Sequence, residues 1–164
     1  MKTPKILTLM TLMLSILILP VQAQDEGKIS LQSIAEIEVV ELDKEGKEVI
    51  VRKPAAEVLP GKMVIYTNII TNDGAEPATE LHLDNPIPED TIYVDGSATG
   101  ENTEISFSVD DGSSFDTPQN LTVLDEEGKP RPATAEDYTH VRWQFEKELP
   151  AQKSYQVSFR VLVK

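Results

Sequence analysis

The chain has 164 residues, of which 28 are acidic and 15 are basic, and it contains no cysteine. The missing thiols exclude disulfides, thiol catalysis and thiolate metal sites. The net charge of −13 disfavours nucleic acids and anionic membrane surfaces as ligands, because binding to phosphate requires a basic surface. Acidity itself indicates solubility and does not identify a partner.

The first 23 residues have the order of a secretory signal peptide. Lys2 and Lys5 precede an uncharged apolar run at 6–19, and Val21-Gln22-Ala23 ends the segment with small or β-branched residues. The apolar run is shorter than the roughly 20 residues that span a bilayer, and no cysteine follows it for lipid attachment. We therefore predict cleavage after Ala23, which gives a secreted or periplasmic protein whose mature form has no membrane span.

The mature part is predicted to be one domain. Residues 24–33 are predicted to be a flexible leader, and residues 34–164 are long enough to form a single β-sandwich with one core. The signal peptide holds two of the basic residues and none of the acidic ones, so the mature protein is more acidic than the whole chain.

The first predicted strand, at 31–42, is long and rich in Ile, Val and Glu. Its two-residue alternation slips at Val39-Val40, which predicts a bulge or a strand that changes sheets. A turn at 43–46 leads into a short strand at 49–51. The run at 31–42 is also suited to add a strand to the sheet edge of a neighbouring protein.

The next predicted strand, at 62–71, is apolar on both faces. Val64, Tyr66 and Ile70 lie on one face, and Met63, Ile65 and Ile69 lie on the other. Monomers rarely leave such a second face open. Either another strand covers it, or Met63, Ile65 and Ile69 belong to an interface with a subunit or partner.

Six further strands are separated by turns rich in glycine and proline. They are predicted at 81–84, 91–94, 103–109, 121–124, 141–145 and 155–163. The last is the clearest, because an apolar residue occupies every second position from Tyr155 to Val163. About eight or nine strands at this spacing predict an all-β fold, an immunoglobulin-like antiparallel β-sandwich.

Two aromatic residues near the end of the chain are predicted to be structural. Trp143 is expected in the core. Tyr155 follows Leu149-Pro150, which is similar to the tyrosine corner of sandwich folds, where the tyrosine hydroxyl bonds to nearby backbone.

The order of turn and strand motifs resembles a known family. The motifs are Pro60-Gly61, Tyr66, Thr71-Asn72-Asp73-Gly74, Pro77-Ala78-Thr79, Asp84-Asn85-Pro86-Ile87-Pro88, Gly96-Ser97-Ala98, Val141-Arg142-Trp143 and Leu149-Pro150-Ala151. Together they are similar to the bacterial "conserved repeat" domain, domain of unknown function eleven. The resemblance covers about Val58 to Lys164. It implies an immunoglobulin-like sandwich in secreted or surface proteins, and the family has no established catalytic residues to carry over.

The chain departs from this family in two respects. The family usually occurs as tandem repeats, whereas this sequence holds a single copy with no internal period. Asn68 also stands where the alternation of the strand calls for an apolar residue.

No catalytic set is recognisable. The sequence has no Gly-x-Ser-x-Gly elbow and no phosphate-binding loop. The two histidines, His82 and His140, alternate with core residues and should point outward. They would share a metal only if their strands pair, and metal sites normally use three or four ligands. We predict no enzyme activity, no catalytic residues and no cofactor.

Calcium is the one ligand that the acidic turns suggest. Asp110, Asp111 and Asp116 lie near Gly112, and a second acidic turn follows at 125–128. Neither has the regular ligand spacing of an EF-hand, and Asp-Gly is also the ordinary sequence of a hairpin turn.

The predicted function is therefore an exported, non-enzymatic structural or interaction module of the bacterial envelope or extracellular space. It would act through a protein partner or self-association. The alternative is a calcium- or glycan-binding module built on the loops of the sandwich.

Overall fold

The computed structural model describes residues 29–164. The predicted signal peptide and residues 24–28 lie outside the described residues. No helix within 29–164 is long and apolar enough to cross a membrane. This part of the chain forms eleven strands and one short 3-10 helix, η1 (Pro118–Asn120).

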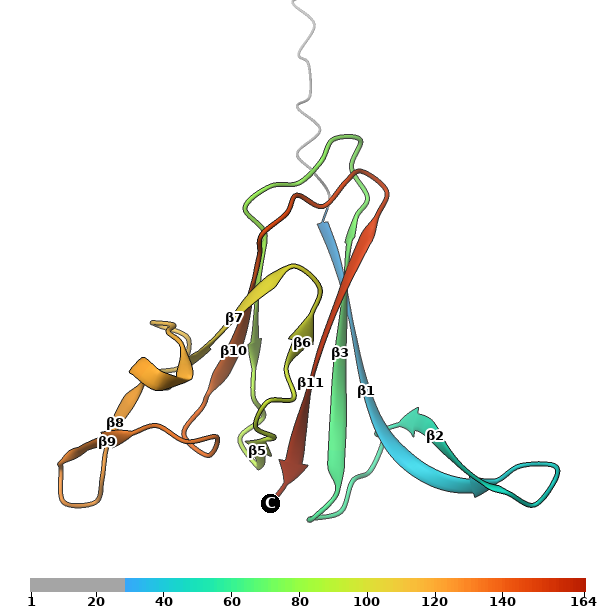
Figure 1. Ribbon diagram of the computed structural model, residues 1–164, viewed down its shortest axis with the longest axis horizontal. Coiled ribbons are helices and arrows are strands. Elements are labelled where there is room, and N and C mark those ends of the chain that lie inside the picture. Colours follow the sequence, from blue (N-terminus) through green and yellow to red (C-terminus); the bar gives the residue numbers. More distant parts are fainter. Residues whose placement is uncertain (1–28) are drawn as a thin grey trace, which may run out of the picture.

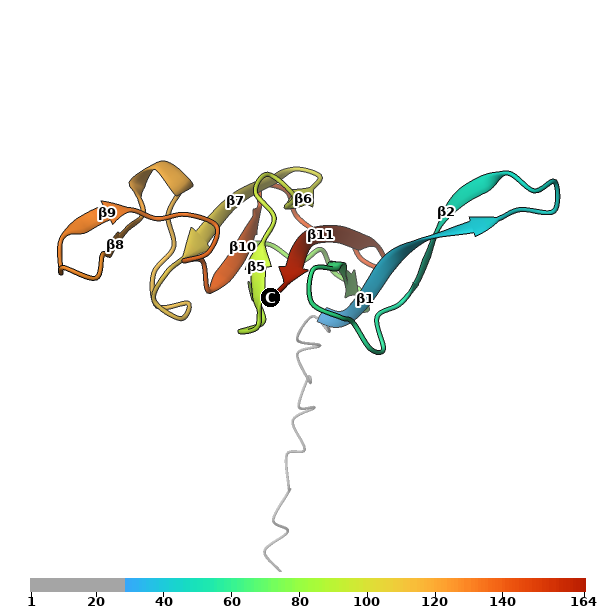
Figure 2. The same cartoon turned by 90° about the horizontal axis from the view of Figure 1, so that it is seen from below.

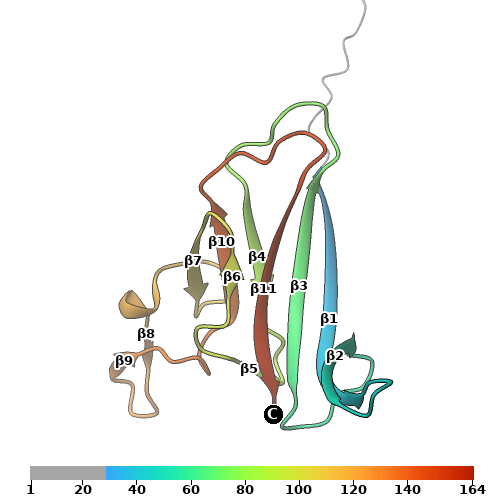
Figure 3. The same cartoon turned by 45° about the vertical axis from the view of Figure 1, so that its right-hand side comes forward.

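Two antiparallel sheets pack face to face (Figure 3). The larger sheet has the order β2-β1-β3-β11-β5, with β6 also paired to β11. Its strands are β1 (Ile29–Leu42), β2 (Glu48–Pro54), β3 (Met63–Asn72), β5 (Thr91–Tyr93), β6 (Thr99–Gly100) and β11 (Ser154–Val163).

The smaller sheet has the order β4-β10-β7. Its strands are β4 (His82–Pro86), β7 (Thr103–Ser108) and β10 (His140–Phe145). A separate two-stranded ribbon is formed by β8 (Thr122–Leu124) and β9 (Pro130–Pro132). The predicted all-β sandwich architecture is confirmed. The two strands that the sequence pattern missed, β6 and β9, have only two and three residues.

The core lies between the two sheets. Its fully buried side chains include Trp143, Phe159, Leu149, Val141, Val157 and Val161. The rings of Trp143 and Phe159 lie 5.9 Å apart, and Tyr66 stacks on Phe159 at 5.2 Å. Trp143 is therefore a core residue, as predicted.

Tyr155 forms the predicted tyrosine corner. Its hydroxyl donates to the carbonyl oxygen of Glu148 at 2.8 Å, and its ring stacks on Phe145 with centroids 5.2 Å apart. The hydrogen bond ties the start of β11 to the loop that precedes it.

Asn68 interrupts the apolar face of β3 because it bridges the two sheets. Its side chain is 1% exposed. It accepts a hydrogen bond from the Ser33 hydroxyl of β1 at 2.6 Å and donates to the Asn85 side-chain oxygen of β4 at 3.0 Å. A buried amide is tolerated here because both of its polar atoms have partners.

The N-terminal strand differs from the prediction in two ways. β1 begins at Ile29 and pairs with β3 from there, so residues 29–33 belong to the sheet and not to a flexible leader. Its pairing register is continuous with both neighbours, which rules out a bulge, and it stays in one sheet. The slip at Val39-Val40 instead lies beyond Glu36, where β1 leaves β3 and continues with β2 alone.

Candidate interaction surface

The β1–β2 hairpin projects from one end of the sandwich, and the β8–β9 ribbon projects from the other (Figures 1 and 2). We call the part from Glu36 to Pro54 the arm. Within it, β1 pairs with β2 from Glu36 opposite Pro54 to Leu42 opposite Glu48, and beyond Glu36 it pairs with β2 alone.

The turn at the tip of the arm is built by Asp43. One of its carboxylate oxygens accepts hydrogen bonds from the backbone N–H groups of Glu45 and Lys47, at 2.8 and 2.9 Å. Gly46 takes the positive φ of 80° that closes the turn. The arm is therefore a regular hairpin whose tip is held by its own residues.

One face of the arm carries an apolar patch that is open to solvent. Val40 and Ile50 are directly opposite each other in the ladder, and Leu42 lies two residues beyond Val40 on the same face. Their exposed fractions are 62%, 70% and 69%, in that order. Beyond Glu36 the strand has no third strand beside it to share this face.

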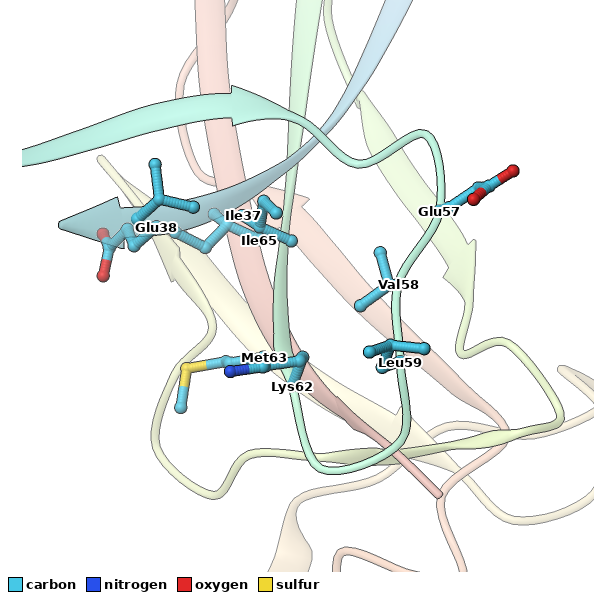
Figure 4. Close-up of a pocket in the computed structure, with 9 residues that line it drawn as sticks. Ile37, Glu38, Glu57, Val58, Leu59, Lys62, Met63 and Ile65 are labelled. Atoms are coloured by element: carbon cyan, nitrogen blue, oxygen red, sulfur yellow. The ribbon is translucent and has the colours of Figure 1, made fainter. Parts of the chain in front are cut away.

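An apolar groove of about 290 Å³ lies at the base of the arm, where β1 separates from β3 (Figure 4). Its apolar lining comes from β1, from the β2–β3 loop and from the start of β3: Ile37, Val39, Val58, Leu59, Met63 and Ile65. Leu59 is 72% exposed although it lines the groove. Ile37 and Val39 point to the face of the arm opposite to Val40 and Leu42, because side chains alternate along a strand, so the arm carries apolar residues on both faces.

The three predicted interface residues lie on the outer face of β3, but they are not equally accessible. Met63 is 41% exposed and Ile65 only 3%, while Ile69 is half-buried. Met63 and Ile65 both line the groove, whereas Ile69 lies farther along the strand. Only Met63 offers a broad surface to a partner.

Charged side chains flank the groove in neutralised groups. Glu38 lies 3.5 Å from Arg52 of β2 and also 3.5 Å from Arg160 of β11. Farther along the arm, Lys53 pairs with Glu41. These pairs are largely solvent-exposed, so each contributes little to stability.

The acidic turns are occupied by their own hydrogen bonds. Asp110 accepts from the hydroxyl groups of Ser114 and Ser108, which lower its pKa to about 2. Asp116 accepts from the side-chain amide of Asn120 and the backbone of Thr117, and its pKa is also lowered.

Asp111 lies in the same loop with a positive φ of 57°. Within residues 29–164, no three His, Asp or Glu side chains are grouped so that they could hold a metal ion. The three calcium candidates, Asp110, Asp111 and Asp116, therefore do not form a joint site in this geometry.

The two histidines lie on neighbouring strands but do not meet. His140 is opposite Pro86 and His82 is opposite Gln144, so they stand at opposite ends of the β4–β10 ladder. Arg142 and Asp84 occupy the position between them and form two hydrogen bonds of 2.6 Å.

This Arg142–Asp84 pair explains the lowered pKa of Asp84, whose main cause is the hydrogen bond from Arg142. The guanidinium of Arg142 also lies 3.8 Å above the ring of Phe115. On the outer face of the smaller sheet, Arg142 is therefore fixed by contacts with Asp84 and Phe115.

The sequence predicted the two strands and the turn of the arm, but not that the hairpin projects from the sandwich with Val40, Leu42 and Ile50 exposed. The sequence does contain an indication of it. Val39 and Val40 are adjacent and apolar, and because side chains alternate along a strand they cannot both face the core of one sandwich. The comparisons with known proteins add no constraint: no family model, no curated protein and no solved structure matches this chain.

Proposed function

We propose that this chain is an exported, non-enzymatic interaction module of the bacterial envelope or extracellular space, which binds a protein partner through the arm and its groove. The observation that carries the proposal is the solvent-exposed apolar patch of Val40, Leu42 and Ile50 on an arm whose other face lines an apolar groove. The resemblance to the "conserved repeat" domain, with its immunoglobulin-like fold and surface location, agrees with this role.

The arm has no structural reason to be apolar on this face. Its three exposed side chains contribute nothing to the core between the sheets, since each keeps more than half of its surface in water. An exposed hairpin that only had to stay soluble would gain from polar residues at these positions. A partner that covers Val40, Leu42 and Ile50 supplies the missing reason.

The charges around the surface indicate the chemistry of the partner. The chain carries a net charge of −13, and the charged side chains that line the groove are Glu38, Glu57 and Lys62. A partner segment with apolar side chains and a neutral or basic flank fits this surface, because an acidic flank would be repelled.

Site-specific photo-crosslinking in the exporting cell tests the proposal. A photoreactive aromatic residue replaces Ile50 in the arm or, as the matched control, Leu124 in the β8–β9 ribbon. The two positions have almost the same exposure, 70% and 67%, at opposite ends of the molecule. We expect one discrete adduct from position 50 and not from position 124, and its loss when Leu59→Asp is added in the groove.

The absence of any adduct at position 50, or the same adduct at both positions, would contradict the proposal. An adduct with twice the mass of the chain would identify the partner of the arm as a second copy.

A further inference from the structure

The part of β1 that lies in the arm has an open edge on the side away from β2. The ladder between β1 and β3 ends where Glu36 is opposite Ile65, and from there to Leu42 only β2 pairs with β1. No other strand of the described chain takes the place that β3 leaves. Residues 38–42 therefore form an edge strand that projects from the sandwich (Figure 1).

Alternate residues of this edge direct their backbone groups outward. The carbonyl oxygen of Ala35 accepts from the N–H of Ala55 at 2.9 Å, on the β2 side of β1. Because the direction alternates along an antiparallel strand, Glu38, Val40 and Leu42 direct their N–H and C=O groups to the opposite side. The ladder with β3 does not reach these three residues, so their outward groups have no backbone partner in the described part of the chain. Such a row of unpaired groups is a template for an additional strand.

The apolar groove lies at the base of the same edge. Ile37 and Val39 of β1 line one side of it, and Met63 and Ile65 of β3 line the other (Figure 4). The groove thus occupies the gap that opens where the two strands separate. A segment that bonds to the outward groups of β1 would run from the tip of the arm toward this gap and end in it. The open edge and the groove therefore form one continuous site for an extended chain.

We infer that an extended segment of another protein adds to this edge as a third strand of the arm and places an apolar side chain in the groove. The inference rests on the proposed function, and it specifies the conformation of the partner and the groups that bind it. Backbone hydrogen bonds to Val40 and Leu42 supply affinity, and the groove supplies specificity, as is usual for strand addition.

The other open edge of the arm, along β2, is protected against pairing. β2 ends in Arg52, Lys53 and Pro54, and charged residues and proline on an edge oppose pairing between chains. The edge of β1 carries two charged residues, Glu38 and Glu41, and both are paired with basic side chains of this chain. The β1 edge is therefore the one that accepts a strand.

A second copy of the chain does not fit this edge. Two identical edges pair antiparallel about a two-fold axis. An axis at Val40 or closer to the base would bring the tip of each arm beside Ile37 of the other, so that the charged Asp43 and Lys44 would enter an apolar groove of about 290 Å³. An axis at Glu41 would set this residue opposite its own copy, and like charges directly opposite each other destabilise a strand pair. The occupant is therefore a segment of a different protein, and the net charge of −13 favours a neutral or basic one.

Proline at position 40 tests the role of the backbone groups. Val40→Pro removes an outward N–H without removing a hydrogen bond to β2, and it keeps an apolar side chain. Val40→Ala is the matched variant, because it loses more of the side chain but keeps the N–H. Glu48→Pro controls for the effect of proline on the hairpin, since Glu48 is opposite Leu42 and its N–H also points away from the ladder, at the other edge.

A photoreactive aromatic residue that replaces Leu59 in the groove reports on these variants in the exporting cell. We expect one discrete adduct in the otherwise wild-type chain and about a tenfold loss of it in Val40→Pro, because a buried acceptor of the partner loses its donor. The loss should be smaller in Val40→Ala, and Glu48→Pro should retain the adduct. Equal losses in the two variants at position 40, a loss as large in Glu48→Pro, or an adduct with twice the mass of the chain would overturn the inference.

Failure of strand addition differs from failure of the proposed function. An adduct at position 50 that survives Val40→Pro, or that occurs without an adduct at position 59, would leave the arm as an interaction surface and count against strand addition alone. No adduct at either position would contradict both.

Hydrogen exchange on the purified adduct of position 59 gives a second test that requires no proline variant. The amides of Val40 and Leu42 are unpaired in the free chain and should exchange rapidly. In the adduct we expect both to exchange more slowly, whereas the amide of Ile50, at the opposite edge of the hairpin, should keep its rate. Unchanged exchange at Val40 and Leu42 in the adduct would overturn the inference.

Discussion

At the scale of single residues, buried polar side chains fix how the strands meet. Asn72 is fully buried and donates to the carbonyl oxygens of Glu76 and Leu149, while its own oxygen accepts from the N–H of Gly74. One side chain thus ties the end of β3 to the turn that follows and to the loop before β11. A buried amide with three partners specifies a single local arrangement, because any displacement leaves polar groups unpaired.

Tyr155→Phe tests how much the tyrosine corner contributes to the stability of the fold. The substitution removes the hydrogen bond to Glu148 and keeps the stack on Phe145, so the free energy of unfolding should fall by about 1 kcal/mol, the usual net contribution of one hydrogen bond. Urea denaturation measures it. The control is Tyr66→Phe, since the hydroxyl of Tyr66 has no hydrogen-bond partner within residues 29–164 and its ring keeps the stack on Phe159. Equal effects of the two substitutions would show that the corner contributes nothing specific.

The sequence predicts residues whose partners are close along the chain better than those whose partners are distant. Tyr155 bonds to a backbone group seven residues away, and the preceding Leu149-Pro150 indicated it. Asn68 bonds to Ser33 and Asn85, which are 35 and 17 residues away, so the sequence showed only an interrupted alternation. No local pattern states which distant side chains will satisfy a buried amide.

At the scale of elements, the two projections of the molecule are held in different ways. Glu38 of the arm pairs with Arg160 of β11 at 3.5 Å, whereas the β8–β9 ribbon is fastened by a shorter, bidentate ion pair. Arg131 of β9 makes two hydrogen bonds of 2.7 Å to Asp137, which precedes β10. Asp137 also accepts from the backbone N–H and the hydroxyl of Thr134, so this carboxylate organises the whole connection.

Asp137→Asn tests this connection through its pH dependence. The hydrogen bond from Arg131 is the main cause that holds the pKa of Asp137 far below its usual value of 3.8. A carboxyl group whose pKa is depressed in the folded state stabilises it above the pKa of the unfolded state, and this contribution is lost as the pH falls below about 4.

Thermal unfolding from pH 7 to pH 2 should therefore show a lower Tm for Asp137→Asn at pH 7, with the difference from the wild type narrowing toward pH 2. Glu136→Gln is the control, because Glu136 makes no hydrogen bond or ion pair within the described part of the chain. A constant difference across the pH range would show that the effect of Asp137→Asn does not come from its charge.

The elements themselves were largely predictable, because period-two alternation and turn residues act locally. The nine strands expected from the pattern are all present. The arm was not predictable in this way. The arm projects because β2 replaces β3 as the paired neighbour of β1 at Glu36. Which of these two segments pairs with β1 depends on residues far apart in the sequence. The slip at Val39-Val40 indicated that β1 changes near this point, but not that it exchanges one neighbouring strand for another.

At the scale of the whole molecule, the net charge of −13 opposes the compact state, because like charges are held closer together in the folded chain than in the unfolded one. The long-range electrostatic free energy of the folded chain is therefore repulsive. Repulsion between exposed charges extends about 30 Å at 0.01 M salt and about 8 Å at 0.15 M.

Added salt should therefore stabilise the folded chain. Thermal unfolding at pH 7 between about 0.01 and 0.5 M sodium chloride should show a Tm that rises as the repulsion is screened. The control is the same salt series near pH 4.5, where the net charge of the chain is close to zero and the Tm should change less. A Tm that falls with added salt at pH 7 would mean that attractive ion pairs outweigh the net repulsion in the folded chain.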